Sequence, residues 1–123
     1  QLPSTTDYNG IYKGNYIDFE AKSCNGSSFP FKSIYPHQLE HLKKVDEHGG
    51  IAFVIIFFKK VDKVFIIDIK PFYEAYKKGQ NGERHSIKYT DIESIGGLEV
   101  SRGFAPLINY LKQVDQLYFE NEK

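Results

Sequence analysis

A short segment near the start of this sequence, residues 15–22, alternates between polar and apolar side chains and reads NYIDFEAK. In an extended strand successive side chains point to opposite faces, so Asp18, Glu20 and Lys22 share one face and Ile17, Phe19 and Ala21 share the other. Two acids and an amine in a row, opposite an apolar row, indicate either a solvated surface or a chemical site.

A further carboxylate, Asp7, precedes this segment in the stretch STTD. An Asn-Gly pair at 9–10 and a Lys-Gly pair at 13–14 are turn signals, and they predict a folded-back pair of strands. Such a pair would bring Asp7 beside Glu20.

Two carboxylates and a lysine suit metal-dependent phosphodiester hydrolysis. Carboxylates hold a hard cation such as Mg²⁺, which keeps several waters and binds substrate phosphate. The metal lowers the pKa of a bound water, and Lys22 can neutralise charge that builds on the phosphorus centre. On spacing alone the signal is weak, because such spacings arise by chance in charged chains and a solvated strand is the commoner explanation.

Six separated motifs occur in order along the chain: STTDYNG at 4–10, YIDFEAK at 16–22, SFP at 28–30, HQ at 37–38, GFAP at 103–106 and QLYF at 116–119. Together they resemble the RecU family of bacterial Holliday junction resolvases, which belongs to the restriction-endonuclease-like superfamily of Asp/Glu-x-Lys nucleases. The resemblance implies a metal-dependent, structure-selective DNA endonuclease that resolves four-way junctions by paired symmetric nicks in recombination and repair. It also implies a homodimer, with recombination proteins as further candidate partners.

The resemblance implies particular roles for five residues. Asp7, Glu20 and Lys22 match the catalytic positions, and Thr5, Asp7, Glu20 and Gln38 match the metal positions for Mg²⁺, with Mn²⁺ as an alternative ion. Asp18 lies on the same strand face but does not match a metal ligand, so it is expected to serve as the control for metal binding.

The position of Gln38 has a second explanation that needs no metal. It lies one helical turn from Leu42 and is expected to face inward. From the pattern alone, a hydrogen bond to buried backbone is the commoner role of such a residue.

The elements predict an α/β fold with a restriction-endonuclease-like core, in which helices flank a mixed central sheet. We expect a polar loop at 24–33, a helix from Pro36 to His48, an apolar central strand at 51–58 and an antiparallel strand at 64–69. A helix at 71–78 is stopped by Gly79, and a loop follows at 79–85. A capped helical turn is expected at 90–93, and a last amphipathic helix is opened by Pro106 and runs to Tyr118.

The 123 residues are expected to form a single nuclease domain. The sequence has no methionine and opens at Gln1, so we expect it to be a fragment. The resemblance implies that the part before residue 4 would supply an N-terminal helix, a first strand and a stalk that engages the junction centre.

Sixteen basic and sixteen acidic side chains give no net charge, which argues mildly against DNA binding, although local lysine clusters suffice for phosphate contacts. No apolar run is long enough to span a membrane, and the single cysteine, Cys24, cannot form an intramolecular disulfide. We therefore expect a soluble, cytoplasmic protein.

Two alternatives from other functional classes stand beside the nuclease. One is a module that binds branched DNA or a recombination protein without cutting, although a nuclease that has lost its activity commonly loses one of the three catalytic residues. The other is a zinc hydrolase, because residues 37–41 read HQLEH and fit the H-x-x-E-H motif. That site needs a third ligand and a cleft that so short a chain can hardly enclose, so we expect these histidines to be surface or phosphate-facing residues.

Overall fold

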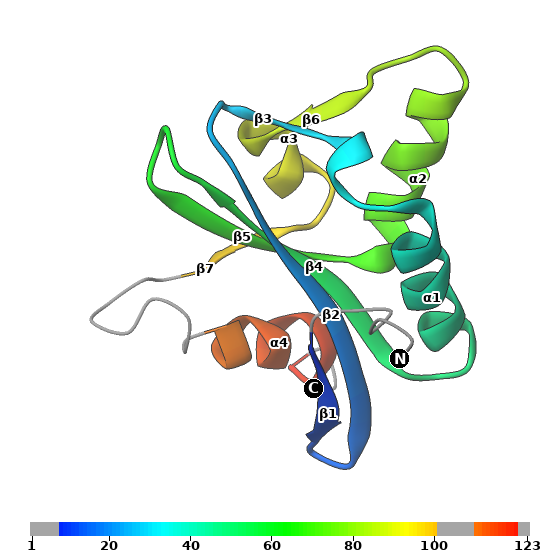
Figure 1. Ribbon diagram of the computed structural model, residues 1–123. Coiled ribbons are helices and arrows are strands. Elements are labelled where there is room, and N and C mark those ends of the chain that lie inside the picture. The colour runs from blue at the N-terminus through cyan, green and yellow to red at the C-terminus, as the bar shows by residue number, and fades with distance from the viewer. Residues whose placement is uncertain (1–7, 101–109, 121–123) are drawn as a thin grey trace, which may run out of the picture.

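The computed structural model describes residues 8–100 and 110–120 (Figure 1). Its centre is a five-stranded sheet with the order β1-β2-β4-β5-β7, and β3 and β6 form a second, two-stranded sheet. The strands are β1 (Tyr8–Tyr12), β2 (Asn15–Cys24), β3 (Ser28–Pro30), β4 (Ile51–Phe58), β5 (Lys63–Asp68), β6 (Ser86–Lys88) and β7 (Leu98–Val100). The helices are η1 (Phe31–Ser33), a single 3₁₀ turn, α1 (Pro36–Glu47), α2 (Ile69–Gln80), α3 (Tyr89–Ser94) and α4 (Tyr110–Tyr118).

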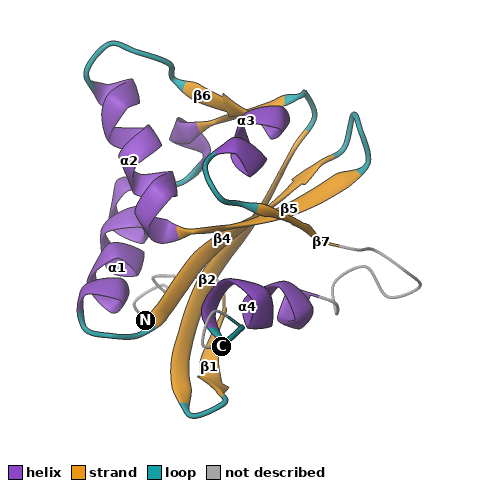
Figure 2. Ribbon diagram, turned by 180° about the vertical axis from the view of Figure 1, so that it is seen from behind, coloured by secondary structure: helices purple, strands orange, loops and turns teal. Residues whose placement is uncertain are grey.

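The central sheet is mixed, because β2 runs parallel to β4 whereas the other neighbouring strands pair antiparallel. This confirms the predicted α/β class, with helices on both faces of the sheet (Figure 2). The strand predicted at 64–69 is also confirmed as an antiparallel partner of β4.

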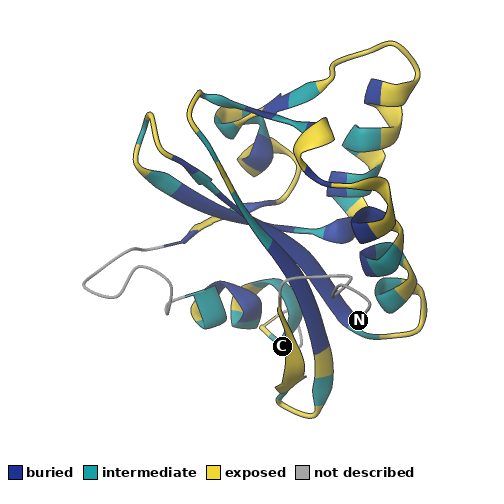
Figure 3. Cartoon of the chain, viewed as in Figure 1, coloured by how far each residue is buried: buried dark blue, intermediate teal, exposed yellow. Residues whose placement is uncertain are grey.

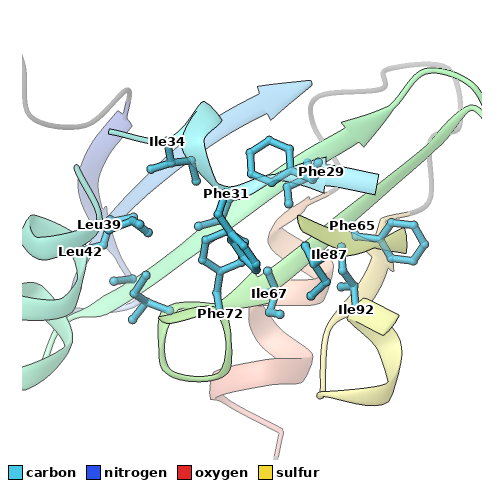
Figure 4. Close-up of a cluster of buried hydrophobic side chains, with 14 of the residues drawn as sticks. Phe29, Phe31, Ile34, Leu39, Leu42, Phe65, Ile67, Phe72, Ile87 and Ile92 are labelled. Atoms are coloured by element: carbon cyan, nitrogen blue, oxygen red, sulfur yellow. The ribbon is translucent and has the colours of Figure 1, made fainter. Parts of the chain in front are cut away.

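Strand β4 divides the interior into two apolar cores, because its side chains are buried on both faces (Figure 3). On one face the side chains of α1, α2, α3, η1 and the small sheet pack against the central sheet, with Phe29, Leu42, Phe72 and, from β5, Ile67 among the buried residues (Figure 4). On the other face α4 covers the sheet, and Val114 is its fully buried residue. An apolar strand that is covered on both faces needs no cofactor to explain it.

The hairpin between β1 and β2 turns at Lys13 and Gly14, which both have positive φ. That geometry suits a tight hairpin turn. The expected turn at Asn9 and Gly10 is wrong, because both residues lie inside β1 and pair with Asp18 and Ile17. The folded-back pair of strands is nevertheless present.

Helix α1 spans the predicted residues and ends before His48. Helix α2 begins two residues earlier than predicted, because the Asp68 carboxylate accepts a hydrogen bond from the Lys70 backbone N–H, 2.9 Å away, and caps the helix. It also continues past Gly79, where the absence of a side chain lets the Arg84 carbonyl oxygen approach the helix.

The predicted loop at 24–33 is wrong, because Phe29 in β3 is fully buried and this strand pairs with β6. Both strands of this small sheet, and β7, are only three residues long, too short to show an alternating pattern. The helical turn expected at 90–93 is confirmed as α3, but no side chain caps it. The expected start of the last helix at Pro106 lies outside the described residues.

Every helix in the described part of the chain is too short or too polar to cross a lipid bilayer.

Candidate active site

The polar face of β2 is buried. Asp18 and Glu20 are both fully inaccessible to solvent, and the side chain of Lys22 is 23% exposed. The Lys22 Nζ lies 3.5 Å from Oε1 of Glu20. A solvated strand face is therefore excluded for Asp18 and Glu20.

Helix α1 covers this face of β2. Its residue His41 places Nε2 2.8 Å from Oδ2 of Asp18, and Tyr35, just before the helix, has its ring centroid 6.0 Å from the Lys22 Nζ. Along one of its edges β2 pairs with β4, and there Glu20 lies opposite Val54. The apolar strand beside Glu20 and the helix over this face of β2 account for the complete burial of the Glu20 carboxylate.

Gln38 faces inward as predicted and is 9% exposed. Its Oε1 accepts a hydrogen bond from the Tyr35 backbone N–H at 3.0 Å, so the side chain caps the start of α1. This is the backbone-bonding role that needs no metal. A carbonyl oxygen has two lone pairs, so the capping bond leaves one acceptor position on Gln38.

Asp18 is bound from two elements. In addition to His41, the Tyr16 hydroxyl donates a hydrogen bond to the same Oδ2 at 2.9 Å. Asp18 therefore joins β2 to α1. That it is not a metal ligand stays a prediction, and an exposed acid outside this network is the better control.

The expectation for the histidines is confirmed for His37, which is exposed and stacks against Tyr35. The His41 side chain is 35% exposed, but its ring also bonds a buried carboxylate. The sequence carried one signal for this contact. His41 lies three residues after Gln38, and residues so spaced share one side of a helix.

Two of the predicted site residues, Thr5 and Asp7, lie outside the described residues. The nearest described residue is Tyr8, which pairs with Phe19 and stacks its ring on that side chain at a centroid distance of 4.8 Å. Phe19 is in turn the neighbour of Glu20. In the sequence, Asp7 directly precedes Tyr8.

The H-x-x-E-H residues contact three different partners. His37 lies against Tyr35, His41 binds Asp18, and Glu40 accepts a hydrogen bond from the Tyr73 hydroxyl at 2.7 Å. The Glu40 carboxylate raises the pKa of Tyr73 to about 12, because it stabilises the protonated phenol.

No group of three His, Cys, Asp or Glu side chains within residues 8–100 and 110–120 is arranged to hold a metal ion. The zinc alternative therefore has no support in the described part of the chain.

Comparison with known proteins matches the chain to a family. Residues 1–116 match the model of the RecU family, described as Recombination protein U. A Holliday junction resolvase RecU of Shouchella clausii is 48% identical over 120 residues, which are 97% of this chain and 56% of that protein. The resolvase of the same name from Bacillus cereus strain B4264 is 48% identical over 118 residues, which are 95% of this chain and 58% of that protein.

The chain thus spans a little more than half the length of these curated relatives. The match of the family model extends over nearly the whole chain and includes β1, β2 and α1, the elements that build the site. This chain belongs to the RecU family.

Proposed function

We propose that this chain is the nuclease domain of a Holliday junction resolvase, a metal-dependent endonuclease that cuts DNA at four-way junctions by paired symmetric nicks. The observation that carries the proposal is the fully buried Glu20 carboxylate with the Lys22 ammonium group 3.5 Å away on the same strand face. Family membership and the names of the relatives support the choice of junction DNA as substrate.

The residues present fit a divalent metal ion. Glu20 supplies a buried carboxylate and Gln38 an amide oxygen with a vacant lone pair, and hard oxygen donors are what Mg²⁺ and Mn²⁺ prefer. We assign Asp7 and Thr5 to the same site. When bound, such an ion supplies a water of lowered pKa and charge stabilisation at the phosphorus centre.

The assignment of Asp7 rests on its match to the family motif and on its place in the sequence. It directly precedes Tyr8, whose ring stacks on Phe19, the neighbour of Glu20 in β2.

We assign to Lys22 the role of stabilising the transition state. Its ammonium group holds a positive charge close to the Glu20 carboxylate and remains partly open to solvent, so it can meet a non-bridging phosphate oxygen. Charge that develops on that oxygen during cleavage strengthens the contact, which lowers the barrier rather than the ground-state energy.

We further propose that the protein acts in the cytoplasm as a homodimer. Cutting two strands of a near-symmetric junction requires two active sites at a fixed separation, and a two-fold axis is the simplest arrangement that provides it. Recombination proteins remain candidate partners. Selectivity for junctions is assigned to the N-terminal helix, first strand and stalk expected upstream, because shape gives selectivity whereas phosphate contacts give affinity.

The test is cleavage of a synthetic four-way junction with Mg²⁺, with Mn²⁺ or with EDTA. The protein is this chain, alone and joined to the upstream portion of the Shouchella clausii relative. We expect metal-dependent paired nicks from the longer protein, and from the shorter one weak, salt-sensitive duplex binding without junction preference. Equilibrium sedimentation should show a dimer for the longer protein.

Glu20→Gln should abolish cleavage and metal binding by isothermal titration, whereas the matched control Glu99→Gln should leave both unchanged, since Glu99 is 44% exposed in its side chain on β7. Lys22→Ala should lower turnover by orders of magnitude and change junction affinity only a few-fold. Junction binding without cleavage in any metal would establish the non-cleaving alternative, and an equal loss of activity in Glu99→Gln would refute the site.

A further inference from the structure

The residue just before α1, Tyr35, exposes its aromatic ring beside the candidate site. It is 61% exposed, which makes it the most exposed phenylalanine or tyrosine among the described residues. A single exposed aromatic residue is common on protein surfaces, so what sets this ring apart is what lies next to it, a second aromatic ring and a lysine.

Two side chains, His37 and Lys22, lie close to the Tyr35 ring. The His37 ring lies nearly parallel to it, with 5.8 Å between centroids and 11° between planes. This is an offset arrangement that leaves part of each ring face uncovered. The Lys22 Nζ lies over the Tyr35 ring, 6.0 Å from its centroid.

The backbone under the ring is held in place. The Tyr35 N–H donates to Gln38 Oε1, and Tyr35 accepts the backbone N–H groups of Gln38 and Leu39 at 2.9 and 3.2 Å. The aromatic surface is therefore presented from a fixed position, so that a ligand binding to it has little conformational entropy to remove.

We propose that Tyr35 and His37 form a stacking platform for an unpaired nucleobase next to the phosphate that Lys22 contacts. The proposal rests on the proposed nuclease function for the identity of the ligand. Flat aromatic rings beside a cation are the combination that binds single-stranded nucleic acid, in which the rings take the bases and the cation takes the backbone.

The platform has a consequence for the kind of DNA it selects. Inside a duplex both faces of each base are covered by its neighbours, so a side chain can stack only on a base that is unpaired, at an end or in a gap. The platform thus favours single-stranded ends and gaps over continuous duplex, a preference separate from the selectivity for four-way junctions assigned to the upstream elements.

The test uses this chain in EDTA, so that no strand is cut, with a short single-stranded oligonucleotide that contains 2-aminopurine as the probe. Stacking on tyrosine quenches the fluorescence of this base. We expect quenching by the native protein and by Tyr35→Phe, and loss of quenching with about five- to a hundred-fold weaker binding in Tyr35→Leu and Tyr35→Ala. His37→Ala should give a smaller loss of affinity.

Tyr35→Leu is the matched control, because it keeps apolar bulk at the position and removes only the aromatic face. Circular dichroism establishes that each variant is folded. Equal affinity and quenching in Tyr35→Leu and Tyr35→Phe would overturn the platform, even if Glu20→Gln abolishes cleavage as expected. Loss of quenching only in the leucine and alanine variants would support the platform even if no metal produced cleavage.

Discussion

The pair formed by Lys22 and Glu20 should contribute to stability as well as to chemistry, and removing the amine tests its geometry. Lys22→Met keeps an unbranched side chain, one atom shorter, and deletes the charge. It leaves the Glu20 carboxylate, which is fully buried, without the ammonium group at 3.5 Å. A buried charge that loses a partner destabilises the folded state.

The magnitude follows from the distance and the exposure. Two unit charges 3.5 Å apart attract by about 5 kcal/mol at an effective dielectric constant near 20. Because the Lys22 side chain is 23% exposed, water competes for the amine, and desolvation cancels much of the gain. We expect Lys22→Met to lower the free energy of unfolding by about 1–2 kcal/mol.

The assay is a double-mutant cycle by urea unfolding in EDTA, which removes ions that could replace the lost charge. In the Glu20→Gln background, Lys22→Met should cost less than about 0.5 kcal/mol, because the charge it compensates is gone. The pair Lys63 and Glu99 is the control, since both side chains are more than 40% exposed at 3.8 Å, and its coupling energy should stay below about 0.5 kcal/mol. The same cost of Lys22→Met in both backgrounds would refute the ion pair.

Three other outcomes test the surroundings of the site. Tyr16→Phe deletes a hydrogen bond to the buried Asp18 carboxylate and should lower the free energy of unfolding by about 1–2 kcal/mol in urea titrations; an unchanged midpoint would contradict the contact. Gly79→Ala should destabilise the protein, measured as a lower thermal midpoint, because the added Cβ would overlap a carbonyl oxygen of the following loop. Glu40→Gln should move the pKa of Tyr73 from about 12 towards 10, since the phenolate no longer faces a carboxylate; NMR of labelled tyrosine follows this titration, and a pKa that stays high would show that another group raises it.

The longer elements of the fold could be predicted because their patterns are strong. Residues 51–58 are apolar on both faces, and Pro36 and Gly49 mark the limits of α1. The three-residue strands β3 and β7 were missed, because pairing with distant strands, rather than local alternation, creates them. The early start of α2 was missed because Asp68 ends a strand and caps a helix at the same residue.

The candidate site, too, could be predicted from the sequence only in part. The common face of Glu20 and Lys22 follows from strand alternation alone, and the inward direction of Gln38 follows from helical spacing. The contact of Asp18 with His41 joins residues 23 positions apart, and no local pattern encodes how a helix packs over a strand. Because of that packing, the Asp18 carboxylate bonds to the helix and joins it to the strand.

The parallel pairing of β2 with β4 affects the order in which this protein is assembled during synthesis. The hairpin of β1 and β2 leaves the ribosome early and can pair at once, but the partner of Glu20 across the sheet is Val54. Everything between them, including α1, must be made before that long loop closes, and such non-local contacts form late. A nascent chain therefore carries Glu20 and Lys22 before the helix and strand that bury them are in place, so the candidate site is assembled only after β4 has been translated.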